Sequence, residues 1–179
     1  GLMSLSENNL RPYVLLTGAS GLVGGLVLAR LLESEVPVAV MVRGNRRQTA
    51  AQRVEALMRR LEERFQRLFG RPVVIDSDLC ATGLGLSSSD RDWIAQNCGS
   101  IIHSAANLLF SPASKHPDNE PYRTNVDGTR HLFELTTSLG IREWHYVSTA
   151  YIAGLRDGTI YEHESNVGQT FGNDYERSK

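Results

Sequence analysis

A tyrosine and a lysine lie four residues apart near the end of the chain, at Tyr175 and Lys179. On a helix, residues at this spacing share a face, so the ammonium group would lie close to the phenol. A nearby positive charge lowers the pKa of a tyrosine from its ordinary value of about 10. The pair could therefore exchange a proton with a carbonyl or alcohol oxygen. Because the same spacing also occurs by chance on solvated helices, its meaning depends on the residues upstream.

A second candidate site is the glycine-rich segment 17–25, which follows a short apolar stretch. Its glycines have the spacing GxxGxxG, which in a strand-to-helix turn allows a tight turn, close approach of a pyrophosphate and close packing of helix on strand. The start of the helix would offer N–H groups and a positive dipole end to phosphate. A glycine-rich turn without a ligand is the alternative. The residues expected to bind a dinucleotide are Thr17, Gly18, Ser20, Gly21, Leu22, Val23 and Gly24.

Arginines follow the second apolar stretch, at the position where NAD-preferring sites usually carry an acid. The stretch ends at Arg43, and Arg46, Arg47 and Arg53 follow with no Asp or Glu among them. A guanidinium group suits the 2′-phosphate of NADPH because it is positively charged and can donate two parallel hydrogen bonds to a phosphate. We therefore predict NADPH rather than NADH, with Arg43 as the first contact and Arg53 as the second. The alternative is a solvated basic loop that leads into a basic helix.

Small and polar residues follow the third and fourth apolar stretches. Asp78 and Leu79 come after the third, where a side chain could meet the edge of an adenine, although Asp78 could equally cap its own turn. Ser104, Ala105 and Ala106 come after the fourth, and their small size would let the backbone pass close to a cofactor.

Three further residues complete the candidate set. His103 is expected to be a packed or ribose-adjacent residue rather than a proton carrier, and Asn125 could bind backbone or water near the site. Thr149 closes the fifth stretch, on the edge of the predicted sheet that also carries the glycine turn and where ligands bind. Its hydroxyl could hydrogen-bond a substrate carbonyl while Tyr175 protonates it.

The elements that must position these residues alternate between strand and helix. Apolar runs predict strands at 13–16, 36–42, 72–75, 100–103 and 143–148. Helices are expected at 22–33, 48–69, 87–97 and 122–139, with one more carrying Tyr175. Such alternation implies parallel βαβ units and a doubly wound parallel sheet of the α/β class, the Rossmann fold.

Apolar periodicity gives two of these helices a predicted buried face. The stripe of the first helix would be Leu22, Leu26, Ala29 and Leu32. The stripe of the long helix would be Val54, Leu57, Met58, Leu61, Phe65 and Leu68.

Composition narrows the class of protein. The chain has 179 residues, 41% of them hydrophobic, and a net charge of -1, which gives no reason to expect a nucleic acid or an anionic membrane as partner. No apolar run approaches the roughly 20 residues that span a bilayer. Cys80 and Cys98 form neither a metal-binding spacing nor a disulfide framework, so a cytoplasmic location is expected.

Taken together, these residues resemble the short-chain dehydrogenase/reductase superfamily in its extended form, from about residue 13 to residue 179. The segments 125–129 (NVDGT), 147–154 (VSTAYIAG) and 171–179 (FGNDYERSK), with the long basic helix, are similar to its thioester reductase and fatty acyl-CoA reductase branch. The resemblance implies that Thr149 orients a carbonyl, that Tyr175 is the acid, and that Lys179 binds the nicotinamide ribose and lowers the pKa of Tyr175. It further implies reduction of acyl thioesters, carried on acyl carrier protein or coenzyme A, to aldehydes or alcohols with NADPH.

The resemblance also bears on domain limits. We expect residues 1–10 to be a disordered N-terminus or an artificial extension, and residues 11–179 to form an NAD(P)-binding domain. The family's last strands and C-terminal substrate-binding portion would be missing from this domain, so the fragment itself could be inactive.

Two other functions stay open on the sequence. One is an NAD-dependent nucleotide-sugar epimerase or dehydratase of the same superfamily, against which the arginine at position 43 argues. The other is a non-catalytic cofactor-binding domain within a larger multidomain synthase, which the presence of Thr149, Tyr175 and Lys179 makes less attractive for the parent protein.

Overall fold

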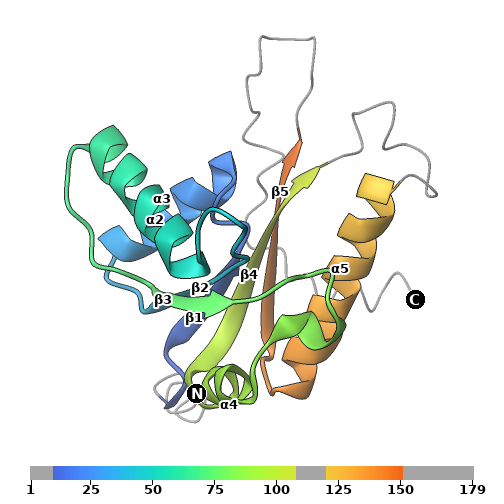
Figure 1. Cartoon of the computed structure of the whole chain (residues 1–179). Helices are drawn as coiled ribbons and strands as arrows, with labels where there is room; N and C mark the ends of the chain where they lie inside the picture. The colour runs from blue at the N-terminus through green and yellow to red at the C-terminus, as the bar shows by residue number, and fades with distance from the viewer. Residues whose placement is uncertain (1–9, 108–119, 151–179) are drawn as a thin grey trace.

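The computed structural model describes residues 10–107 and 120–150, and describes side chains for residues 10–104 and 128–147. Strands and helices alternate along these residues, as the sequence predicts (Figure 1). The strands are β1 (Tyr13–Thr17), β2 (Val38–Val42), β3 (Val73–Asp76), β4 (Cys98–Asn107) and β5 (Glu143–Ala150). The α-helices are α2 (Leu22–Glu33), α3 (Ala50–Phe65), α4 (Ser88–Asn97) and α5 (Glu120–Ser138), and η1 (Thr82–Gly85) is a short 3₁₀ turn.

The strands form one parallel sheet with the order β3-β2-β1-β4-β5. The chain order reverses between β1 and β4, which makes the sheet doubly wound, and the predicted fold class is confirmed. All strands point the same way, so their carboxyl ends meet at one edge. In an open sheet of this kind, ligands bind beside the point of reversal at that edge.

Two hydrophobic layers cover the two faces of the sheet. Leu16, Val40 and Val42 pack with buried residues of α2 and α3 on one face. Leu15 and Met41 point the other way, into a layer shared with η1, α4 and α5. Figure 1 shows α2 and α3 on one side of the sheet and α5 on the other. Burial on both faces explains why the strands read as continuous apolar runs rather than as alternating ones.

The start of α3 is fixed by a capping box. The backbone N–H of Gln52 donates to the Thr49 hydroxyl over 3.1 Å, and the backbone N–H of Thr49 donates to the Gln52 side chain over 2.9 Å. The helix ends at Phe65, not at residue 69 as predicted, because Gln66 adopts a left-handed backbone conformation (φ 54°). The predicted buried stripe is therefore right as far as Leu61 and wrong beyond it, and Leu68 is 83% exposed.

The predicted buried face of α2 is also partly wrong. Leu22 is exposed, whereas Gly24, Gly25, Leu28 and Ala29 form the buried face. The helix packs so closely on the sheet that its glycine side, rather than its leucine side, faces inward at the first turn.

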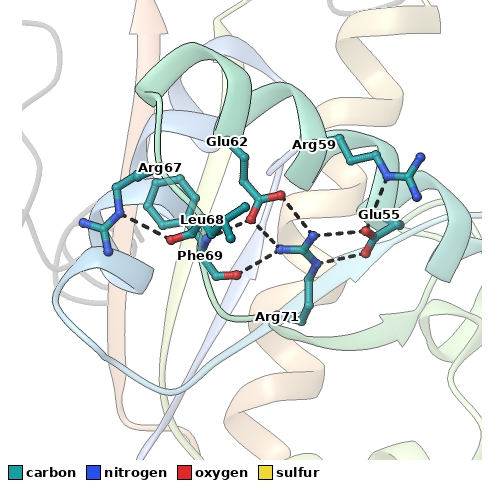
Figure 2. Close-up of polar contacts among 7 residues, drawn as sticks. All are labelled: Glu55, Arg59, Glu62, Arg67, Leu68, Phe69 and Arg71. Carbon is teal, nitrogen blue, oxygen red and sulfur yellow. Dashed lines mark hydrogen bonds and ion pairs between the residues drawn. The ribbon is translucent and has the colours of Figure 1, made fainter.

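Arg71 ties the end of α3 to the start of β3 (Figure 2). Its guanidinium group donates to the carboxylates of Glu55 and Glu62 over 2.9 to 3.1 Å and to the carbonyl of Phe69 over 3.0 Å. The Glu62 carboxylate also accepts the backbone N–H of Phe69. Hydrogen bonds from Arg71 lower the pKa of both glutamates below the ordinary value. This network fixes the segment between α3 and β3.

The carboxyl ends of β4 and β5 extend beyond the other strands. Thr17, the last residue of β1, pairs with His103, whereas β4 continues to Asn107. Thr149 in β5 pairs with Ala106, three residues farther along β4 than His103. At about 3.3 Å per residue, the backbone of Thr149 lies about 10 Å beyond the end of β1 along the strand direction. The sequence predicted both strands shorter than they are.

No helix among the described residues combines the length and the apolar character needed to cross a membrane.

Candidate nucleotide-binding site

The turn between β1 and α2 fits against the neighbouring strand only with glycine at two positions. Gly18 has a left-handed backbone (φ 75°), and a Cβ there would lie 1.8 Å from the carbonyl oxygen of Ser104. A Cβ at Gly24 would lie 1.8 Å from the carbonyl oxygen of Gly18. The glycine spacing therefore lets strand, turn and helix pack in contact, as the sequence predicts.

Gly21 has a different environment from the other two glycines. A Cβ there would meet only the Gly18 carbonyl oxygen, at 3.4 Å, so packing does not exclude a side chain. Gly21 is the N-cap of α2 and no side chain caps this helix end. Uncapped N–H groups at the start of a helix, with an open approach to them, suit a phosphate. The residues present thus fit the pyrophosphate of a dinucleotide.

A cavity of about 240 Å³ opens beside the turn. It lies at the carboxyl ends of β1, β2 and β3, the edge where ligands bind in such sheets. Its lining contains seven of the residues that the sequence assigns to the nucleotide: Thr17, Gly18, Ser20, Arg43, Arg53, Asp78 and Leu79. Ala19, Met41, Val42 and Ser77, which the sequence did not single out, complete it.

Arg43 and Asp78 face each other across this cavity. Asp78 Oδ1 accepts the backbone N–H of Cys80 over 2.9 Å, so the predicted cap of its own turn is present. Asp78 Oδ2 lies 3.6 Å from Arg43 Nε, an ion pair in which Arg43 is exposed and Asp78 is half-buried. Arg53 Nη1 donates to the backbone carbonyl of Arg43, which anchors the end of β2 to α3. The structure therefore brings together both arginines that the sequence selected.

His103 lies buried beneath the glycine turn. Its Nδ1 hydrogen-bonds the Thr17 hydroxyl and its Nε2 lies 3.0 Å from the Thr129 hydroxyl, so it links β1, β4 and α5. Burial lowers the pKa of His103 to about 4, and the ring is neutral near pH 7. The prediction of a packed histidine is confirmed.

Several predicted residues have positions but no described side chains. Ala105 and Ala106 lie in β4, Asn125 in α5 and Thr149 in β5. Ser104 is buried in β4, and its backbone carbonyl contacts the glycine turn. Leu22 and Val23 open α2 as predicted. Tyr175 and Lys179 lie outside the described residues.

Sequence reasoning missed a second cavity, of about 290 Å³, which adjoins the first through Ser20, Val42 and Arg53. Arg60 lines it together with Asn45 and Gln48. The signal was available in the sequence, since residues 53 and 60 are seven apart and seven residues make about two helical turns. The complete lining is Ser20, Val42, Asn45, Gln48, Arg53, Val54, Ala56, Leu57 and Arg60.

The two cysteines have different environments. Cys98 is buried, which raises the pKa of its thiol to about 12 and leaves it unreactive, while Cys80 is exposed. Within the described residues, no group of three or more His, Cys, Asp or Glu side chains could hold a metal ion.

Fold and site together define an NAD(P)-binding Rossmann domain. Residues 16–179 match the model of the male sterility protein family, and the chain belongs to this family. Fatty acyl-CoA reductase 1 of Pongo abelii is 31% identical over 159 residues, which cover 84% of this chain and 30% of that protein. The chain thus spans less than a third of the length of the curated relatives that it matches first.

Two solved reductase structures are also similar. The terminal R domain of the myxalamid PKS-NRPS biosynthetic pathway is 28% identical with a TM-score of 0.57, over 78% of this chain and 35% of that one. The reductase domain of a nonribosomal peptide synthetase from Mycobacterium tuberculosis is 27% identical, also with a TM-score of 0.57, over 82% of this chain and 36% of that one. These relatives confirm the predicted thioester reductase branch of the extended short-chain dehydrogenase/reductase superfamily.

Proposed function

We propose that the protein is an NADPH-dependent reductase of acyl thioesters carried on coenzyme A or on an acyl carrier protein. The observation that supports this best is the cavity at the carboxyl edge of the sheet, with the glycine turn on one side and Arg43 on the other. The names of the relatives, a fatty acyl-CoA reductase and reductase domains of synthetases, favour a thioester as substrate.

The choice of NADPH rests on charge at the end of β2. Arg43 lines the cavity where NAD-preferring sites usually carry an acid, and Arg53 lines it as well. Asp78 is the acid in the cavity lining, and it lies on β3's side of the cavity and pairs with Arg43. A 2′-phosphate would contribute more negative charge than one carboxylate and would bind the guanidinium through two hydrogen bonds.

The proposed chemistry uses three residues at and beyond the extended end of β5. A bound nicotinamide would supply the hydride to the thioester carbonyl carbon. Thr149 would orient the carbonyl oxygen, and Tyr175 would give its proton to that oxygen as charge develops there. Lys179 would bind the nicotinamide ribose and favour loss of the Tyr175 proton through its positive charge. Breakage of the C–S bond then leaves an aldehyde and a free thiol.

The position of Thr149 supports this arrangement. Its backbone lies about 10 Å beyond the end of β1 along the strands, one strand past β4. A dinucleotide with its pyrophosphate on the glycine turn is long enough to place its two ends well apart along this edge. The adenosine end would occupy the cavity near Arg43, and the nicotinamide end would extend toward β5.

The segments of the relatives that match this chain are parts of longer proteins. The curated relatives are longer, and the similar R domains belong to synthetases. We propose that residues 11–179 form the cofactor-binding domain of such a protein. Its substrate would be an acyl group in thioester linkage.

Turnover and binding together test this function. The full-length protein should oxidise NADPH when given a long-chain acyl-CoA and should not do so with the free fatty acid. Tyr175→Phe should lower turnover by about 10²-fold or more while NADPH binding stays unchanged, because general acid catalysis contributes about that much. Absence of activity with acyl-CoA and with acyl-carrier thioesters alike would refute the proposal, and a fully active Tyr175→Phe variant would refute the role of the tyrosine.

A further inference from the structure

The second cavity has the chemistry of an anion site. Its lining includes two guanidinium groups, one hydroxyl and two amide side chains, from Arg53, Arg60, Ser20, Asn45 and Gln48, and includes no carboxylate. Strong hydrogen-bond donors with a net positive charge and no acid suit phosphate. Since this cavity shares Ser20, Val42 and Arg53 with the nucleotide cavity, one ligand could occupy both.

Arg59 on α3 has a carboxylate partner, whereas the two arginines that line the cavity have none in residues 10–104 and 128–147. Arg59 lies 3.6 Å from Glu55, a pair that Figure 2 also draws, and Arg67, which follows the end of the helix, lies 3.8 Å from Glu33. Within the part of the chain that the structure describes, no carboxylate pairs with Arg60 or Arg53, the two arginines that line the cavity. Arg53 and Arg60 therefore keep their positive charge at the cavity without a carboxylate partner among the described residues, as Arg64 also does elsewhere on α3.

Hydrogen bonds within residues 45–48 hold the loop between β2 and α3, which also lines this cavity. Asn45 Oδ1 accepts the backbone N–H groups of Arg47 and Gln48 over 2.9 and 2.8 Å, and the Asn45 N–H donates to the Gln48 carbonyl over 2.8 Å. Because the Asn45 oxygen is occupied, the amide nitrogen is the atom left to face a ligand, and it can only donate. The wall is thus preorganised for an acceptor-rich group.

We propose that this second cavity binds a phosphate monoester on the nucleotide, the 2′-phosphate, and that Arg60 is a specificity-determining cation there. The inference rests on the proposed preference for NADPH and adds a residue to it. Arg53, which lines both cavities, would hold one side of the phosphate, and Arg60 and Asn45 would hold the other, while Arg43 lines the first cavity only. Arg53 stands between the cavities and fixes the Arg43 backbone.

Binding of nucleotide fragments to the purified full chain tests the role of Arg60 without any catalytic step. Calorimetry with adenosine 2′,5′-bisphosphate and with 5′-AMP compares ligands that differ only in the 2′-phosphate. Arg60→Ala should weaken the binding of adenosine 2′,5′-bisphosphate by about tenfold or more, since hydrogen bonds between charged groups are stronger than those between neutral ones. Binding of 5′-AMP should not change, and Arg60→Lys should recover part of the loss.

Arg59→Ala is the matched control, because Arg59 is the adjacent arginine and is already paired with Glu55. It should leave the affinity for both nucleotides unchanged. If Arg60→Ala binds adenosine 2′,5′-bisphosphate as tightly as the wild type, which itself prefers this ligand over 5′-AMP, the role of Arg60 is refuted and the NADPH preference stands. If the wild type binds both ligands equally, the 2′-phosphate site is refuted. Neither result depends on whether the protein reduces thioesters.

Discussion

At the residue scale, the three glycines of the turn serve two different physical needs. Gly18 and Gly24 are required by packing, because a Cβ at either position would collide with a backbone carbonyl at 1.8 Å. Packing does not require Gly21. The absence of a side chain there instead leaves the N–H groups at the start of α2 accessible to a phosphate. The spacing in the sequence predicts all three positions and a separate purpose for each. It could not predict that a Cβ at Gly18 would collide with the Ser104 carbonyl, since this depends on how closely β4 lies against the turn.

This difference predicts opposite outcomes for two alanine variants. Gly24→Ala should lower the free energy of unfolding by about 2–3 kcal/mol, because overpacking forces the backbone to shift. Gly21→Ala should fold with a stability within about 1 kcal/mol of the wild type and yet bind NADPH at least about tenfold more weakly. Denaturant unfolding and NADPH fluorescence titration measure the two effects. Unchanged NADPH binding by Gly21→Ala would show that phosphate does not approach this turn.

His103 makes the fold sensitive to acid. Its pKa is about 4 in the folded protein and about 6.5 in an unfolded chain, so the unfolded state binds the proton more readily. The contribution of neutral His103 to the free energy of unfolding is therefore complete above pH 6.5. It is lost as the pH falls toward 4, by up to about 1.4 kcal/mol per pH unit. Urea unfolding between pH 7.5 and 4.5 should show this decline. In His103→Gln, which does not titrate, the slope between pH 6.5 and 5 should be much smaller, and an unchanged slope would assign the effect to other groups.

At the element scale, sequence periodicity located the strands and helices and misplaced several ends. The end of α3 depends on the left-handed conformation of Gln66 and on Arg71 holding the following segment to Glu55 and Glu62. Those contacts join residues up to sixteen positions apart and leave no periodic signal. The buried face of α2 was misplaced because close packing favours glycine, which a search for apolar residues overlooks. The short turn η1 was missed because its shape rests on left-handed backbone at Gly83 and Leu84.

The capping box at the start of α3 also belongs to this scale. Thr49→Ala removes the hydroxyl that accepts the Gln52 N–H, and should lower the free energy of unfolding by about 1 kcal/mol. Thr49→Ser keeps an acceptor at the same place and should stay close to the wild type. Thermal or urea denaturation of the three proteins gives the comparison. Equal stability of the alanine and threonine forms would mean that the cap contributes nothing to the folded state.

At the scale of the whole molecule, the strand order explains why distant residues form one site. Parallel strands bring the carboxyl ends of β1, β2 and β3 to the same edge, so that residues 17–20, 41–43 and 77–79 line one cavity. The alternation of strand and helix predicted this edge correctly. It did not predict the second cavity, for which the seven-residue spacing of Arg53 and Arg60 on α3 was the signal in the sequence. The roles of Thr149, Tyr175 and Lys179 remain predictions from the sequence.

The central claim is hydride transfer from NADPH to a thioester carbonyl, and isotopic labelling tests it most directly. The full-length protein is incubated with an acyl-CoA and NADPH that carries deuterium at the nicotinamide carbon that donates hydride. Mass spectrometry of the product should find deuterium on the former carbonyl carbon, in an aldehyde or alcohol, with one free thiol released for each acyl group reduced. Recovery of the acyl group as the unlabelled carboxylic acid, or of intact thioester beside unoxidised NADPH, would contradict the claim.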